Sequence, residues 1–214
     1  MDILKGRPYG GCAVFWRHNL NAKVVHVDTG SNRICAVQFV TSQHKLLLIN
    51  VYVPFEDSYI DTDEYSFQLA IISDLMDQYP DSHVIFGDDC NVDFSRDRSH
   101  TTLLVNFCED NSLMPTVKHS SCMVDYCYHF NLARFSILDH FILSQGLFDN
   151  PVVSVSTVHD VDNLSDVDNF SDHEPLCLVL RLDVDLNKVS NRMPTDKIAL
   201  YKANEIQRLP IVKL

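Results

Sequence analysis

The stretch HVIFGDDCNVDFSRD, residues 83 to 97, joins a buried strand to a run of acidic and amide side chains. Its apolar run at 83–87 is followed at once by the acidic pair Asp88 and Asp89. Strand ends are where a sandwich brings residues distant in sequence to one rim, and the loops held there carry much of protein function. Residues 83–87 are therefore predicted to be a strand that places Asp89 and Asn91 at such a rim.

Around this strand the chain alternates short β-rich runs with turn residues and two helical stretches. Apolar residues recur at helical spacing at about 63–78, where Phe67 and Leu75 are expected to face the core, and at about 100–110. Ser99 is placed to cap the second helix. The predicted strands are 11–16, 23–27, 34–40, 46–53, 83–87, 135–143, 151–158 and 175–184. This alternation indicates a mixed α/β sandwich, with its first strands as antiparallel neighbours.

The length and composition indicate one folded domain. The 214 residues can bury a sizeable core, and a hydrophobic fraction of 46% agrees with a globule. We expect the domain to span residues 1–185 and residues 186–214 to be a linker and helical tail. The apolar runs stop at strand length, and the first residues lack the apolar core of a signal peptide. An intracellular location, nuclear or cytoplasmic, is therefore expected.

The formal net charge of −12 works against the binding of nucleic acid by the chain as a whole. A local basic strip or a bound divalent metal would have to overcome this charge, and the segment SRDRSH at 95–100 is a candidate strip. The seven cysteines include no C-x-x-C pair, which favours reduced thiols over a zinc knuckle.

Polar residues stand at the ends of four predicted strands. They are Tyr52, the pair Asp89 and Asn91, Asp139, and Asp172 with His173. Phosphoester hydrolysis needs such a set, because carboxylates hold a hard divalent metal and a carboxylate orients the attacking water. A tyrosine hydroxyl can donate to phosphate, and a histidine paired with an aspartate can manage a proton. Asp89 with Asn91 alone would be interpreted as a turn, and Tyr52 alone as strand packing. His173, flanked by an aspartate and followed by Pro175 before a strand, favours function, and so do the motifs taken together.

The last motif occurs twice, because DNLSDV at 162–167 is followed by DNFSDH at 168–173. Only the second copy ends in a histidine, and Pro175 leads it straight into the next predicted strand. We therefore assign the functional role to the second copy. The first copy is interpreted as a duplication that lengthens an acidic loop, because it lacks the glycine and distal glutamate of a calcium loop.

Four motifs in this order resemble the endonuclease/exonuclease/phosphatase superfamily: INVYVP at 49–54, GDDCNVDFSRD at 87–97, SILDHFIL at 136–143 and SDHEPL at 171–176. They resemble most closely the apurinic-type endonuclease domain of non-long-terminal-repeat retrotransposons, over about residues 5–184. The resemblance implies the α/β (α+β) fold class, as a four-layer sandwich of two mixed β-sheets flanked by helices. It also implies a Mg²⁺-dependent endonuclease that nicks target DNA, with a reverse transcriptase domain of the same polyprotein as partner.

The resemblance implies a role for each matching residue. Asp89 resembles the aspartate that polarises the attacking water, and Asn91 the amide that steadies this aspartate. His173 resembles the histidine that faces the scissile phosphate, and Asp139 the carboxylate that orients it. Tyr52 resembles a tyrosine that contacts phosphate.

The metal site of the family is represented by Asp172, which resembles one of its carboxylate ligands. Mg²⁺ is the implied ion and Mn²⁺ a substitute, since oxygen ligands and a phosphate substrate suit them. The family's first-strand asparagine and its principal metal-binding glutamate have no counterpart in residues 1–9. The resemblance therefore implies a domain truncated at its N-terminus, with its first strand or strands missing.

Three residues inside the motifs depart from the family pattern. Asp88 stands where a glycine is usual, Cys90 where an aromatic or leucine side chain packs, and Cys127 where a threonine usually makes a hydrogen bond. Cys127 is the weaker donor, and Asp88 adds negative charge close to the expected phosphate position.

Two alternatives to the endonuclease stay open at this point. The chain can be a catalytically inactive, truncated remnant. It can also be a phosphoesterase of the same superfamily that acts on a substrate other than DNA, such as a phosphoinositide, a sphingolipid or RNA.

Overall fold

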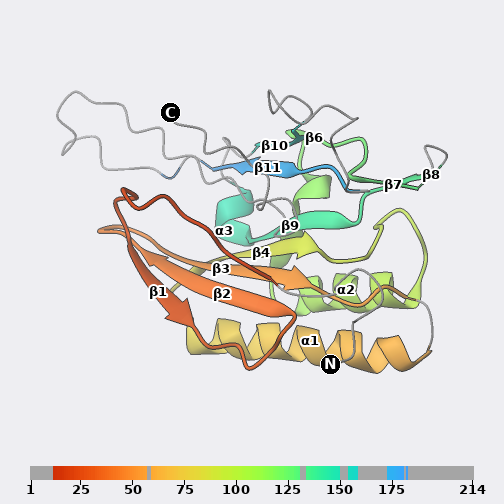
Figure 1. The fold of residues 1–214 in the computed structure, drawn as a ribbon, viewed down its shortest axis with the longest axis horizontal. Helices are drawn as coiled ribbons and strands as arrows, with labels where there is room; N and C mark the ends of the chain where they lie inside the picture. Colours follow the sequence, from red (N-terminus) through yellow and green to blue (C-terminus); the bar gives the residue numbers. More distant parts are fainter. Residues whose placement is uncertain are drawn as a thin grey trace, which may run out of the picture.

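A six-stranded mixed sheet is the largest element of the computed structural model (Figure 1). The structure describes residues 12–56, 59–130, 134–149, 154–158, 173–180 and 182. The strands are β1 (Lys23–Val27), β2 (Ile34–Val40), β3 (Lys45–Tyr52), β4 (His83–Asp89), β5 (Leu113–Pro115) and β9 (Asp139–Ser144). In the order β1-β2-β3-β4-β9-β5 the pair β3–β4 is parallel and the other pairs are antiparallel. The antiparallel pairing predicted for the first strands is confirmed from β1 to β3.

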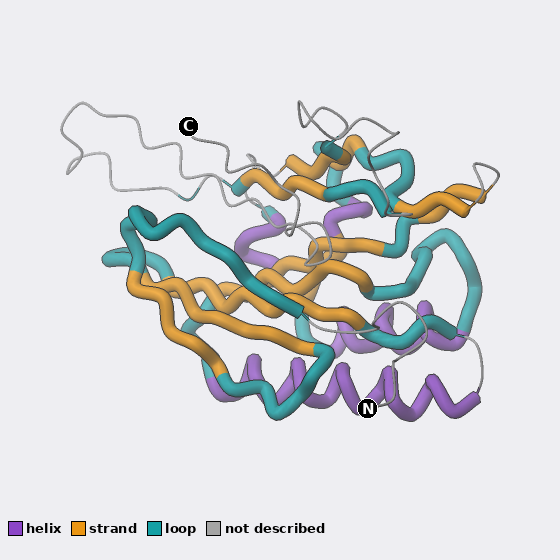
Figure 2. The backbone as a smooth tube through the Cα atoms, in the orientation of Figure 1, coloured by secondary structure: helices purple, strands orange, loops and turns teal. Residues whose placement is uncertain are grey.

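Two helices cover one face of this sheet (Figure 2). They are α1 (Tyr59–Gln78) and α2 (Ser99–Asp110), and shorter helical turns lie at η1 (Thr116–Lys118) and α3 (Gln145–Phe148). The core side of α1 includes Tyr65, Ile72 and Leu75, the last as predicted. The prediction for Phe67 is wrong, because its side chain is 59% exposed. Phe67 lies two residues from Tyr65 and thus on the opposite side of a helix with 3.6 residues per turn.

The start of α2 also differs from the prediction. Ser99 is the first helical residue instead of the cap, and Arg98 before it makes no side-chain capping bond. The carboxylate of Glu56, in the loop after β3, accepts the N–H groups of Ser99 and His100, each at 3.3 Å. A negative group at a helix N-terminus satisfies these exposed donors and is favoured by the helix dipole. The local sequence pattern could not reveal a cap that comes from a distant segment.

A smaller sheet covers the opposite face of the large one. Its strand order is β11-β10-β6, and β7 and β8 form a separate pair. These strands are β6 (Cys122–Met123), β7 (Tyr128–Phe130), β8 (Arg134–Ser136), β10 (Ser154–Thr157) and β11 (Leu176–Val179). Apolar side chains of the two sheets meet in a second core, which includes Leu48, Phe141, Val155 and Leu178. The predicted α+β sandwich of two β-sheets with helices is confirmed.

The run at 11–16 does not form the predicted strand over its described residues 12–16. A side-chain bond ties this segment to the sheet instead, because Asn50 Nδ2 on β3 donates to the backbone oxygen of Ala13 at 3.1 Å. The strand predicted at 135–143 is divided into β8 and β9.

All seven cysteines are free thiols in this structure, and three of them are buried. Among the described residues, no helix is both long enough and apolar enough to span a membrane. The predicted tail at 186–214 and the domain boundary at residue 185 lie outside the described residues.

Candidate functional site

Three neighbouring strands end at one rim of the large sheet. β3 and β4 are parallel and finish at Tyr52 and Asp89, which are register partners. β9 begins at Asp139, the antiparallel partner of Asp89. β4 and β9 approach closely at Gly87 because glycine has no Cβ. A Cβ at this position would collide with the backbone oxygen of His140. β4 runs beyond its predicted end at Gly87, and the register places Tyr52, Asp89 and Asp139 side by side.

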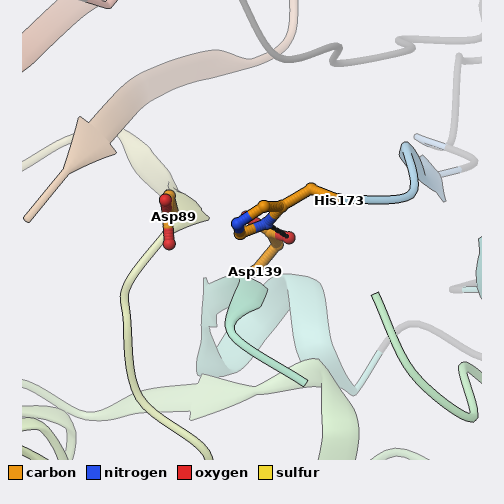
Figure 3. A group of neighbouring side chains, drawn as sticks. All are labelled: Asp89, Asp139 and His173. Carbon is orange, nitrogen blue, oxygen red and sulfur yellow. Dashed lines mark hydrogen bonds and ion pairs between the residues drawn. The ribbon is translucent and has the colours of Figure 1, made fainter. Parts of the chain in front are cut away.

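His173 reaches this rim from the segment before β11, and Figure 3 shows its ring between the carboxyl groups of Asp89 and Asp139. His173 forms an isolated antiparallel β-bridge with Tyr128. The centroids of the Tyr128 ring and the His173 imidazole lie 4.9 Å apart. His173 Nδ1 donates to Asp139 Oδ2 at 2.7 Å, and both residues are buried. The ligand atoms of Asp89, Asp139 and His173 all lie within 4.8 Å of one another. Three residues predicted from separate motifs therefore meet.

Asp89 and Asn91 are connected in a different way from the one expected. The backbone N–H of Asn91 donates to Asp89 Oδ1 at 3.3 Å, whereas the side-chain amide Nδ2 donates to the backbone oxygen of Val53 at 2.8 Å. Asn91 has a φ of 50°, a left-handed conformation that asparagine adopts more readily than most residues. The turn thus steadies the carboxylate of Asp89 through its backbone, and the amide of Asn91 joins this turn to the end of β3.

The guanidinium group of Arg33 lies next to Tyr52, and no sequence motif marked this arginine. The guanidinium carbon of Arg33 lies 5.7 Å from the centre of the Tyr52 ring, and Arg33 Nη1 donates to the backbone oxygen of Tyr52 at 3.3 Å. Arg33 Nε also lies 3.5 Å from Glu64 Oε1, so part of its charge is balanced. A single arginine in the bend before β2 gives no signal in the sequence, since its partners come from β3 and α1.

Arg96, from the candidate basic strip, lies on the loop that follows Asn91. Its Nη2 donates to Ser136 Oγ on β8 at 2.6 Å, and its Nε lies 3.3 Å from Asp93 Oδ2. Arg96 therefore ties the loop after β4 to the strand pair that leads into Asp139.

The two histidines near the rim have different roles. His140 follows Asp139 on β9, and successive strand residues face opposite sides of a sheet. His140 Nε2 donates to the backbone oxygen of Val92 at 2.7 Å, and burial lowers the pKa of His140. These contacts place the side chains of His140 and Asp139 on opposite faces of β9.

The rim is acidic. Burial, together with the nearby charge of Asp88, raises the pKa of Cys12 to about 12. Asp88 has a φ of 103°, a region that glycine tolerates and other residues rarely adopt. A glycine would adopt this backbone conformation without strain, whereas the backbone of Asp88 is strained.

The carboxylates at the rim fit a hard divalent cation. Mg²⁺ commonly takes one or two protein carboxylates and completes its shell with water and phosphate oxygens. Asp89 and Asp139 supply such oxygens, whereas the imidazole is a poorer donor for Mg²⁺ and is already bonded to Asp139 through Nδ1. Asp172, the predicted ligand, and the first copy of the duplicated motif lie outside the described residues.

Solved structures of the endonuclease/exonuclease/phosphatase fold resemble this chain. The endonuclease domain of TRAS1, a telomere-specific non-LTR retrotransposon, has a TM-score of 0.52 at 17% identity, over 73% of this chain and 66% of that domain. A Neisseria 3′ phosphatase, NExo, bound to a product DNA hairpin, has a TM-score of 0.53 at 15% identity, over 74% and 70%. An endonuclease/exonuclease/phosphatase family protein from Leptotrichia buccalis has a TM-score of 0.51 at 10% identity, over 71% and 53%.

At identities this low the likeness establishes the fold. The match spans 66% of the retrotransposon domain and 53% of the Leptotrichia protein. No family model and no curated protein matches the sequence. The fold implied by the four motifs is confirmed: the chain has the architecture of the endonuclease/exonuclease/phosphatase proteins.

Proposed function

We propose that this chain is a metal-dependent phosphodiester hydrolase that nicks DNA, as the endonuclease module of a retrotransposon. The observation that carries the proposal is the meeting of Asp89, Asp139 and His173, from three separate strand ends, within 4.8 Å. A histidine bonded to a carboxylate beside a second carboxylate is a set that can move protons at a phosphate.

Asp89 is assigned to the attacking water. The N–H of Asn91 holds its Oδ1, so the carboxylate has a fixed direction. Asp89 accepts a proton from water while the water oxygen forms a bond to phosphorus. The bond from phosphorus to the leaving ester oxygen breaks, and that oxygen requires a proton or a positive partner.

His173 is assigned to the phosphate. Because Asp139 Oδ2 accepts from Nδ1 at 2.7 Å, the proton on Nδ1 is held there and Nε2 is the nitrogen that serves the substrate. The carboxylate also stabilises the imidazolium form, which can donate to a phosphate oxygen. Tyr52, whose strand end adjoins Asp89, is proposed to donate its hydroxyl to the same phosphate.

The carboxylates of Asp89 and Asp139 would hold Mg²⁺, or Mn²⁺ in its place, with Asp172 as a further proposed ligand. A bound divalent ion supplies positive charge that neutralises the phosphate and acts as a Lewis acid. Positive charge at this rim is needed because the chain has a formal net charge of −12. Arg33 adds part of its charge from the protein itself, because Glu64 balances the rest.

DNA is proposed as the substrate on the strength of two structural neighbours. One is described as the endonuclease domain of a telomere-specific retrotransposon, and the other is a 3′ phosphatase bound to a DNA hairpin. In keeping with the first, we propose an intracellular site of action, nuclear or cytoplasmic. We also propose that residues 186–214 lead from the hydrolase domain of residues 1–185 toward a reverse transcriptase.

Incubation of the purified chain with supercoiled plasmid and Mg²⁺ tests the proposal. The wild-type chain should convert supercoiled plasmid to nicked circles, and His173→Ala should slow this by about 10³-fold or more. His83→Ala is the matched control, because His83 is exposed and lies at the other end of β4 from Asp89. It should nick as the wild-type chain does.

A second substrate, DNA that ends in a 3′-phosphate, separates the alternatives. Release of phosphate without nicking would replace the endonuclease by a phosphatase that uses the same rim. Absence of both activities with Mg²⁺ and with Mn²⁺ would contradict the proposal and favour an inactive chain.

A further inference from the structure

A buried thiol lies next to the Asp139–His173 pair without belonging to it. Cys127 is 0% exposed and immediately precedes β7. We propose that Cys127 is a positioning residue whose sulfur, as a hydrogen-bond acceptor, fixes the Asp139–His173 pair. The proposal rests on the function proposed for that pair.

The first line of support is the contact of the sulfur with the start of β9. Cys127 Sγ accepts the backbone N–H of Leu138 and that of Asp139, each at 3.1 Å. Both residues are buried, so water cannot readily replace the sulfur as a partner for these donors. A buried N–H without a partner costs about 1 to 3 kcal/mol, so the two bonds favour one arrangement of the chain at Asp139.

The second line of support comes from the backbone of the same residue. The N–H of Cys127 donates to the oxygen of Ser136 at 3.1 Å, and the oxygen of Cys127 accepts the N–H of Glu174 at 2.6 Å. Glu174 follows His173, and Tyr128 bridges to His173. Cys127 thus holds the segment that carries the histidine and the segment that carries its aspartate.

The thiol is in the state that this role requires. A thiol is mostly protonated at neutral pH, and a protonated sulfur can still accept hydrogen bonds through its lone pairs. The S–H can point toward the backbone oxygen of Ser136 or of Asp139, each 3.8 Å away. The sulfur lone pairs then remain directed at the two N–H donors.

Three substitutions at this position distinguish positioning from packing. Cys127→Ser keeps an acceptor, whereas Cys127→Ala and Cys127→Val remove it, and the valine keeps most of the side-chain volume. Cys108→Ala is the matched control, because Cys108 is also a buried free thiol but packs on α2 in the other core. A role in packing alone predicts that valine preserves the site better than serine does.

The direct readout is the ¹H NMR resonance of the proton between His173 Nδ1 and Asp139 Oδ2, which a short hydrogen bond to a carboxylate moves strongly downfield. The resonance should persist in Cys127→Ser and Cys108→Ala and disappear in Cys127→Val and Cys127→Ala. The nicking kcat should fall about 10- to 100-fold in the valine and alanine variants, the range known for supporting residues around catalytic groups, with KM unchanged.

The resonance and the rate can fail separately. If wild-type chain does not nick DNA but the resonance follows the pattern above, positioning stands and the proposed function falls. If the valine variant keeps both the resonance and the rate, the proposal is overturned while the function stands. If the alanine and valine variants do not fold, the serine variant decides, because loss of its resonance would overturn the proposal and persistence would support it.

Discussion

The two faces of the six-stranded sheet give a buried histidine different hydrogen-bond partners, one neutral and one charged. On the helix side, His140 bonds to the neutral backbone oxygen of Val92 at 2.7 Å, and burial lowers its pKa. On the side of the second sheet, His173 makes a bond of the same length, 2.7 Å, to the carboxylate of Asp139. Burial alone excludes positive charge, whereas a carboxylate partner compensates for it. The adjacent residues Asp139 and His140 thus belong to different regions, one suited to proton transfer and one to packing.

Asp139→Asn should have the largest effect, because it removes the carboxylate that distinguishes His173 from His140. An amide keeps the shape of the side chain but cannot stabilise an imidazolium, and it can hold the wrong tautomer of His173. The nicking rate should fall about 10³- to 10⁴-fold, the effect of such a change in histidine–aspartate catalysis. His140→Gln, one residue along β9 on the other face, should leave the rate near that of the wild-type chain. Equal losses of rate in the two variants would show that the two faces are not functionally distinct.

The lowered pKa of His140 predicts a pH dependence of stability. Below pH about 6.5 the unfolded chain binds a proton at this histidine more readily than the folded chain does. The free energy of unfolding therefore decreases as the pH falls below 6.5, by at most about 1.4 kcal/mol per pH unit for this one group. The charges of Asp139 and Asp93 act in the opposite direction but are weaker than burial.

Urea unfolding at pH 7 and pH 5 measures this effect. The decrease between the two values should be smaller in His140→Gln than in the wild-type chain, since the other histidines are common to both. A decrease of the same size in both proteins would remove His140 as its source.

Asp88→Gly should have the smallest effect and the opposite sign. The φ of 103° at Asp88 is strained for any residue with a Cβ, and the substitution relieves this strain. We expect the free energy of unfolding to rise by about 1 kcal/mol, measured by urea unfolding at pH 7. Asp110→Gly, at the end of α2, is the control and should be neutral or destabilising. An Asp88→Gly protein less stable than wild type would show that the carboxylate offsets the strain.

Much of the fold followed from patterns that are local in the sequence. Apolar alternation and turn residues identified most of the large sheet, and helical spacing identified α1 and α2. Phe67 was misplaced because an aromatic residue at approximate helical spacing can lie on either side of the stripe. The cap of α2 was missed because Glu56 reaches it from another part of the chain.

The site could be predicted only in part, for a related reason. Asp89, Asp139 and His173 follow from motifs at strand ends, and the sheet brings them together. Arg33 and Cys127 act through contacts with β3 and β9 that no local pattern records. The sequence marked Cys127 only as a departure from threonine, while the structure gives its sulfur two N–H donors.

The most direct test of the account is the rate of plasmid nicking by Asp89→Asn with saturating Mg²⁺. Asp81→Asn is the control, because Asp81 is an exposed carboxylate just before β4, paired with Lys45 at 3.3 Å. The account predicts that Asp81→Asn nicks at the wild-type rate and that Asp89→Asn is slower by about 10²- to 10⁴-fold, the usual contribution of a general base. Equal nicking by the wild-type chain and Asp89→Asn would contradict the assignment of this rim as the hydrolytic site.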